Sequence, residues 1–191
     1  MRFVFRLLLL CVIALGVGFG LSYYALTDGR MFTVSQLGPW TAWPDVGSPN
    51  PNPYTRAHLT REAALQLGQA EGLHFVANVD SAGEPLWRNC SYLIEGRTPQ
   101  ATFWTLVATD PAGINVAVPD GPLALRSTGI VRENDGSFRI HVGTTLAPGN
   151  WLELAGEGPF TLGLTLYDTA VFTGFGATGD TMPAIQRGAC T

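Results

Sequence analysis

The chain has 191 residues, enough for one domain and an additional segment. It is 46% hydrophobic and only 14% charged, its 11 basic residues are all arginine, and its formal net charge is -4. No basic patch that could neutralise phosphates is visible, which argues against nucleic acid as a partner. The 23 glycines and 13 prolines favour strands and turns over a mainly helical fold.

The N-terminal segment, residues 1–29, is predicted to be a transmembrane signal anchor. Residues 7–26 contain no charged side chain. A helix that rises about 1.5 Å per residue crosses a hydrocarbon core of about 30 Å with this length. Arg2 and Arg6 precede the apolar run, so the positive-inside rule places the N-terminus in the cytoplasm and the remainder outside.

A cleaved signal peptide is the alternative interpretation of this segment. Its apolar region usually has about 7–15 residues and ends at small residues. Here the run is longer and ends without an Ala-x-Ala pattern, which favours an uncleaved anchor. Gly16 and Gly20 would permit a homo-oligomer through close helix approach, although small residues are common in such segments without that role.

Residues 30–54 are predicted to form a connector to a domain that spans residues 55–191. Prolines at alternate positions from Pro49 to Pro53 favour an extended backbone. Trp40 and Trp43 allow two interpretations. They dock the connector onto the domain, or they form an aromatic platform for a ligand or for the membrane interface.

One helix and several strands are predicted in the domain. The helix extends from Thr55 to Leu73, with an apolar stripe at Leu59, Ala63, Leu67 and Ala70. Strands are expected at 73–79, 90–95, 101–109, 123–132, 137–143 and 160–167, separated by turns at 80–83, 110–113 and 133–136. This order predicts a mainly β fold: an antiparallel β-sandwich, jelly-roll-like, with one packed helix.

Two of the strands carry distinctive patterns. The segment 101–109 is apolar on both faces, which is typical of a strand covered on both sides. In the last strand Phe160, Leu162, Leu164 and Leu166 alternate with smaller or polar residues, so they are expected to face the core.

Cys90 and Cys190 are predicted to form a disulfide, because the expected topology places both in an oxidising compartment. The bridge would close a loop of about 100 residues and stabilise the fold by about 4–5 kcal/mol in the loop-entropy treatment. Neither cysteine has a second ligand at metal-binding spacing. No metal site and no cofactor are predicted.

Several blocks of the sequence resemble the DUF1214 family, a domain of unknown function in bacterial envelope proteins. The blocks lie at 101–110, 134–142, 148–152, 158–168 and 183–187. Chain length and the N-terminal anchor resemble the short, single-domain members of alphaproteobacteria. The resemblance implies a β-sandwich in the envelope, hence a single-pass inner-membrane protein with a periplasmic domain. It implies no defined chemistry.

Motifs of common enzyme classes are missing from the sequence. There is no Gly-x-Ser-x-Gly and no phosphate-binding loop with Gly-Lys-Ser/Thr. The segment 174–179 matches Gly-x-Gly-x-x-Gly, but no strand–helix context surrounds it. The histidines at positions 58, 74 and 141 do not pair at metal spacing.

Binding or scaffolding is therefore the predicted function, with an envelope protein or a glycan as partner. The candidate ligand-binding residues are Trp104, Asp110, Arg126, Ser127, Asn150 and Trp151. Arg126 offers a fork of donors, and Trp151, in a predicted loop, could stack on a sugar ring. A tryptophan in a strand is more often core, and Asn150 after Pro-Gly is more often part of a turn.

An envelope hydrolase or carbohydrate-active enzyme is the alternative function. It would use carboxylates at strand ends, two of them about 5–10 Å apart across one cleft. The available acids are Asp110, Asp120, Glu153, Glu157 and Asp168.

Overall fold

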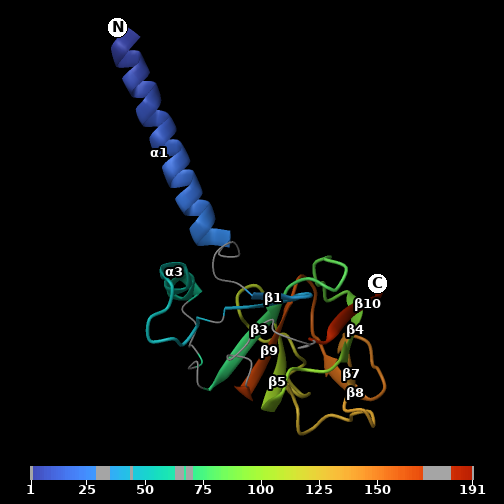
Figure 1. Ribbon diagram of the computed structural model, residues 1–191. Helices are drawn as coiled ribbons and strands as arrows, with labels where there is room; N and C mark the ends of the chain where they lie inside the picture. The colour runs from blue at the N-terminus through green and yellow to red at the C-terminus, as the bar shows by residue number, and fades with distance from the viewer. Residues whose placement is uncertain are drawn as a thin grey trace.

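The structure, a computed structural model, describes residues 2–28, 35–43, 45–62, 67, 71–169 and 182–190. The helices are α1 (Arg2–Asp28) and α3 (Pro53–Glu62). The strands are β1 (Ser35–Leu37), β2 (Trp40–Ala42), β3 (Gly72–Ala77), β4 (Cys90–Gly96), β5 (Ala101–Thr109), β6 (Leu125–Arg126), β7 (Phe138–Gly143), β8 (Asn150–Glu153), β9 (Thr161–Thr169) and β10 (Ala184–Cys190) (Figure 1).

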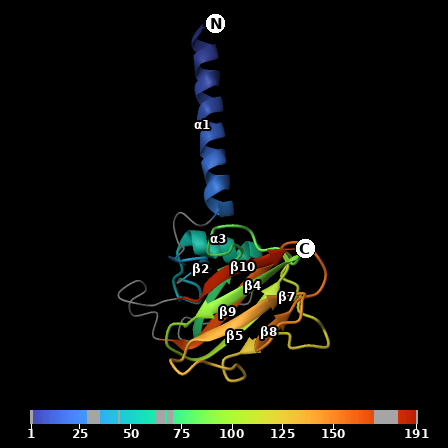
Figure 2. The ribbon, with the colours of Figure 1, turned by 90° about the vertical axis from the view of Figure 1, so that its right-hand side faces the viewer.

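Two sheets form a β-sandwich, as the sequence predicts. The larger sheet has the strand order β1-β2-β3-β9-β5-β6, and the smaller sheet has the order β10-β4-β7-β8. Figure 2 shows the smaller sheet lying across the larger one. Aromatic side chains join the layers: Trp104 lies 5.2 Å from Phe138, and Tyr92 lies 5.6 Å from Phe160, between ring centroids.

Strand β9 holds the larger sheet together. Its inward side chains and Phe160 are at most 2% exposed, which confirms the alternation read from the sequence. The strands β3 and β5 both pair antiparallel with β9, so they run in the same direction as each other. Gly163, in the middle of β9, lies opposite Val76 on one side and Val107 on the other.

Strand β5 has the predicted bounds, but its two faces differ. Trp104, Leu106 and Ala108 are buried between the sheets. Phe103 and Val107, on the opposite face, are only half-buried. The outer face of the larger sheet is therefore partly open at this strand.

The predicted helix Thr55–Leu73 is too long. α3 ends at Glu62, Leu67 lies outside any helix, and Leu73 pairs in β3 with Leu166. Burial of β3 against β9 outweighs the helical pattern there, because strand pairing adds long-range core contacts that a short amphipathic helix lacks. Ala63 and Ala70 of the predicted stripe lie outside the described residues, as does the segment 174–179.

Two further local predictions are wrong. The segment 123–132 contributes only the two residues of β6. The Ser127 N–H still donates to the carbonyl of Trp104 in β5, but the N–H of Gly129 then donates to the carbonyl of Arg126 and turns the chain away from the sheet. Asn150 and Trp151, expected in a loop, belong to β8. β8 pairs with β7 in parallel, so the sandwich is not antiparallel throughout.

The connector contributes to the larger sheet through β1 and β2. Trp40 is fully buried, and its Nε1 donates to the carbonyl of Pro183 over 2.7 Å. Docking on the domain, the first of the two interpretations, therefore holds for Trp40. Trp43 contributes to a cavity that is described in the next subsection.

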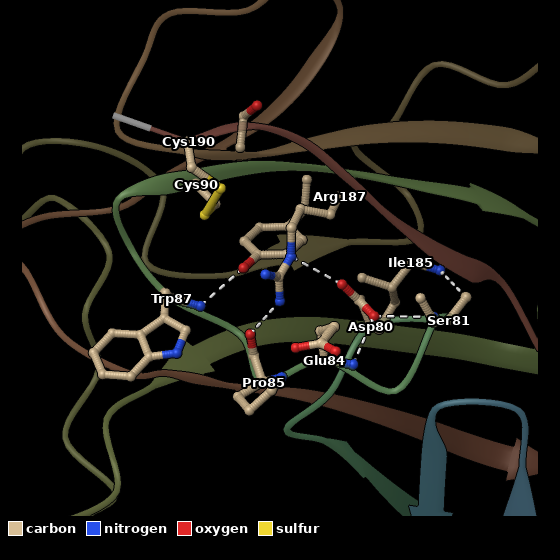
Figure 3. Close-up of polar contacts among 12 residues, drawn as sticks. Asp80, Ser81, Glu84, Pro85, Trp87, Cys90, Ile185, Arg187 and Cys190 are labelled. Atoms are coloured by element: carbon tan, nitrogen blue, oxygen red, sulfur yellow. Dashed lines mark hydrogen bonds and ion pairs between the residues drawn. A yellow bond between two sulfur atoms is a disulfide. The ribbon is translucent and has the colours of Figure 1, made fainter.

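The C-terminal strand is fixed covalently and by an ion pair. The predicted disulfide Cys90–Cys190 joins β4 to β10 across a sequence separation of 100. Arg187 of β10 places its Nε 2.9 Å from Oδ2 of the buried Asp80 (Figure 3). These two links hold the last strand against the core.

The helix α1 extends away from the sandwich (Figure 1). Residues Arg2–Tyr24 are long and apolar enough to cross a membrane, and none of the span's apolar window is buried in the protein. This helix is either a membrane anchor or a signal segment. Gly16 and Gly20 have open space around them.

Candidate functional site

A cavity of about 660 Å³ lies on the outer face of the larger sheet. Its floor is formed by β3, β9 and β5. Its lining also includes Trp43, Val46, Leu59 and Leu67, and residues of the turn 110–113. Small-molecule sites typically have volumes of about 300–1,000 Å³ with apolar walls and a few polar groups. The cavity has both properties.

His74 is the central polar side chain of this floor. It projects from β3 toward β9, where its Nδ1 lies 2.8 Å from Oγ1 of Thr165. The two residues are direct partners in the β3–β9 register. Whichever atom of the pair donates, Nε2 of His74 has no partner among the described residues and can serve a ligand.

Gly163 makes room for the imidazole. A Cβ added at Gly163 would lie 2.9 Å from Cε1 of His74 and 3.1 Å from Cγ2 of Val107. A side chain at this position would have to displace the imidazole, so glycine allows its close approach to β9. The missing side chain also deepens the floor between Val76 and Val107.

The pKa of His74 lies below its ordinary value because the surrounding protein removes hydration from the imidazole. The ring keeps contact with solvent through the cavity, since the residue as a whole is exposed. The lowered pKa keeps the imidazole uncharged near neutral pH. His74 therefore offers a hydrogen bond to a ligand without adding a positive charge.

Asp110 is the acidic side chain of the cavity wall. Its Oδ1 accepts hydrogen bonds from the backbone N–H groups of Ala112 and Ile114, both at 2.9 Å. Its Oδ2 has no partner among the described residues, and the side chain is half-buried. A fixed carboxylate thus lines the same cavity as a neutral imidazole.

Of the six predicted ligand-binding residues, Asp110 is the one in the cavity lining. Trp104 is buried in the core and donates its backbone N–H to Oγ of Ser127. Arg126 is exposed on β6 and pairs with Thr105, which faces outward on the same side of the sheet as His74 and Thr165.

The remaining two candidates lie in the smaller sheet. Asn150 bridges main-chain groups of Val131 and Arg139 through its amide. Trp151 lies opposite His141 in the β7–β8 pair. Neither lines the cavity, so the structure does not bring the six residues together.

The cavity offers one carboxylate and one imidazole. A glycosidase requires two carboxyl groups across a cleft, and Asp110 is the acid that lines this cavity among the described residues. Asp168 instead accepts a hydrogen bond from Thr102. Within the described ranges, no group of three or more His, Cys, Asp or Glu is placed to hold a metal ion.

Sequence reasoning did not single out His74, Gly163 or Thr165 as site residues. The alternation in 73–79 and 160–167 does place all three on the outer face of their strands. A glycine on the polar face of an otherwise regular strand is the signal that could have revealed the site, because it indicates close approach of another group.

The fold and the cavity define a class: a β-sandwich domain with a ligand-sized cavity on one outer face. The model of the family described as "Protein of unknown function (DUF1214)" matches residues 71–171, more than half of the chain. The protein belongs to this family. None of the curated proteins matches the chain.

Two solved structures are similar to this chain. The VPA0106 protein from Vibrio parahaemolyticus has a TM-score of 0.58 and 18% sequence identity, over 73% of this chain and 36% of that one. A putative uncharacterized protein from Burkholderia cenocepacia has a TM-score of 0.46 and 16% identity, over 81% of this chain and 36% of that one. The first likeness supports the fold alone.

Proposed function

We propose that this chain is a membrane-tethered binding module with its DUF1214 domain in the bacterial periplasm. The binding role rests on one observation: a cavity of about 660 Å³ whose floor holds the imidazole of His74 against Gly163. The walls are largely apolar, so the ligand is a small molecule with an apolar body and a few polar groups.

The location rests on the N-terminal helix and the disulfide. A span that begins with Arg2 and Arg6 and continues without charge fits a cytoplasmic N-terminus. The Cys90–Cys190 bridge fits an oxidising compartment. Both features support a membrane-anchored member of the family.

Binding is tested with the full chain in lipid nanodiscs. Ligand-observed saturation-transfer NMR with benzamide as a neutral aromatic probe should show binding. Thr109→Trp should abolish it, because Thr109 lines the cavity and the added indole fills it. Thr102→Trp is the matched control, since Thr102 lies on the same strand but is exposed and outside the cavity. Equal saturation transfer in the two variants would refute the binding role.

The topology is tested separately in cells. A C-terminal alkaline phosphatase fusion should be active, since that enzyme requires the periplasm. The intact mass of the purified protein should include residues 1–29. A mature protein that lacks this segment would replace the anchor by a cleaved signal peptide, and an inactive fusion would contradict the periplasmic domain.

A further inference from the structure

The larger sheet carries two turns with the same backbone arrangement. The Asp80 turn (residues 80–84) follows β3, and the Asp110 turn (residues 110–114) follows β5. Because β3 and β5 both run antiparallel to β9, the two turns lie at the same end of the sheet. Their sequences share the pattern Asp-x-Ala-Gly.

The hydrogen bonds of the two turns match one by one. In each, the aspartate N–H donates to the carbonyl four residues later, over 2.8 Å. In each, Oδ1 accepts from the N–H groups two and four residues later, at 2.9–3.0 Å. Gly83 and Gly113 both have positive φ, 89° and 80°. The turns thus present their carboxylates in the same local frame.

In the Asp80 turn this frame receives a guanidinium group. Nε of Arg187 lies 2.9 Å from Oδ2 of Asp80, and Nη2 donates to the carbonyl of Pro85 (Figure 3). The guanidinium carbon lies 5.7 Å from the ring centroid of Tyr92. The first carboxylate is therefore matched by a cation with an aromatic group beside it.

One residue explains why the Asp110 turn has no such partner in the part of the chain that the structure describes. Ser81 holds β10 in place: its N–H donates to the carbonyl of Ile185, and its hydroxyl accepts from the N–H of Ile185 over 2.9 Å. Pro111 stands at the equivalent position and has neither group. A strand therefore cannot dock there in the same way, and the turn lines the cavity instead.

We propose that the cavity binds a small organic cation whose amidinium, guanidinium or ammonium group pairs with Oδ2 of Asp110. The proposal rests on the proposed binding function and specifies its ligand class. Trp43 also lines the cavity, so an aromatic side chain is available to the bound ligand. The lowered pKa of His74 keeps a competing positive charge out of the cavity.

The test compares benzamidinium with benzamide, which have the same shape and differ in charge. Competition is measured by saturation-transfer NMR on the full chain in nanodiscs, at low salt and neutral pH. Benzamidinium should bind about tenfold or more tightly, as expected for a charge-assisted hydrogen bond. Asp110→Asn, which keeps the Oδ1 acceptor, should remove this preference. Asp120→Asn, an exposed acid outside the cavity, should retain it.

Each outcome separates the two proposals. Benzamide and benzamidinium of equal affinity, both blocked by Thr109→Trp, would overturn the cation proposal and leave the binding role intact. A preference for benzamidinium that survives Asp110→Asn would also overturn it. If neither probe binds in the cavity, the proposed function fails and the cation proposal fails with it.

Discussion

The Asp80 turn and the Asp110 turn lie at one end of the larger sheet and have alike backbones, yet their surroundings differ. β10 docks against the Asp80 turn, and the carboxylate of Asp80 is only 2% exposed and paired with Arg187. In the second turn Asp110 is half-buried, the residues after it are exposed, and the turn lines a cavity. The same local structure therefore serves as a structural joint in one place and as a candidate binding site in the other.

The difference shows what decides whether such a turn stabilises the fold or can bind a ligand. A buried carboxylate requires a partner, because its desolvation costs several kcal/mol when the charge stays unpaired. Arg187 meets that requirement within the chain for Asp80. Asp110 keeps partial solvation, so it tolerates a free oxygen until a ligand arrives. Four predictions test this comparison.

The largest effect is expected from the disulfide that fixes β10 beside the Asp80 turn. Replacing Cys90 and Cys190 by serine should lower the free energy of unfolding by about 4 kcal/mol, because the bridge restricts a long loop in the unfolded chain. Denaturant unfolding followed by tryptophan fluorescence measures this. The control is Cys11→Ser, which keeps the Cys90–Cys190 bridge. An equal loss of unfolding free energy in this control would show that the bridge is not the source of the stability.

The second effect comes from the two carboxylates themselves. Asp80→Asn should cost about 3 kcal/mol, the lower end for breaking a buried pair, because Arg187 keeps 28% of its side chain exposed. Asp110→Asn should change stability by less than about 0.5 kcal/mol. The two variants make the same chemical change in the same backbone frame. Equal unfolding free energies would mean that Arg187 does not stabilise the first turn.

The third effect should be the same in both turns. Gly83→Ala and Gly113→Ala each place a side chain at positive φ with open space around it, so only backbone strain contributes. Each should cost about 1–2 kcal/mol. Denaturant unfolding of the two variants under the same conditions measures the loss of unfolding free energy in each. A difference larger than about 1 kcal/mol would show that the frames are not equivalent.

The sequence predicted these turns and the strands before them, because Asp-x-Ala-Gly and period-two alternation are local signals. It also predicted the disulfide, since two cysteines that are expected to lie in an oxidising compartment have few alternatives. It could not predict the roles of the turns. Asp80 and Asp110 look alike locally, and the partner of Asp80 lies more than a hundred positions away at Arg187.

The candidate site was only partly accessible from the sequence for the same reason. Asp110 could be chosen because an acid at a strand end is a local feature. His74, Gly163 and Thr165 form one unit only through the β3–β9 register, which pairs residues about ninety positions apart. The choice of Trp104 followed residue type, but its parity in β5 turns it to the core with Leu106.

The smallest expected effect is a loss of stability at acidic pH that arises from His74 in the cavity. The pKa of His74 is lowered by desolvation in the folded protein, whereas the unfolded chain takes up this proton near pH 6.5. Between the two pKa values the unfolded state binds more protons, so stability should fall as pH decreases from about 6.5 and level off below the folded pKa. His74→Asn should remove this part of the pH dependence.

The matched variant for this prediction is Thr165→Val. It removes the hydroxyl beside Nδ1 of His74 but leaves the imidazole in place, so the desolvation by the neighbouring protein is kept. Because burial is the cause of the lowered pKa, the acid-dependent loss should persist in Thr165→Val when unfolding is measured between pH 5 and pH 8. If Thr165→Val loses this pH dependence of the unfolding free energy, as His74→Asn does, the prediction is wrong. The hydrogen bond to Thr165, and not desolvation, would then set the pKa of His74.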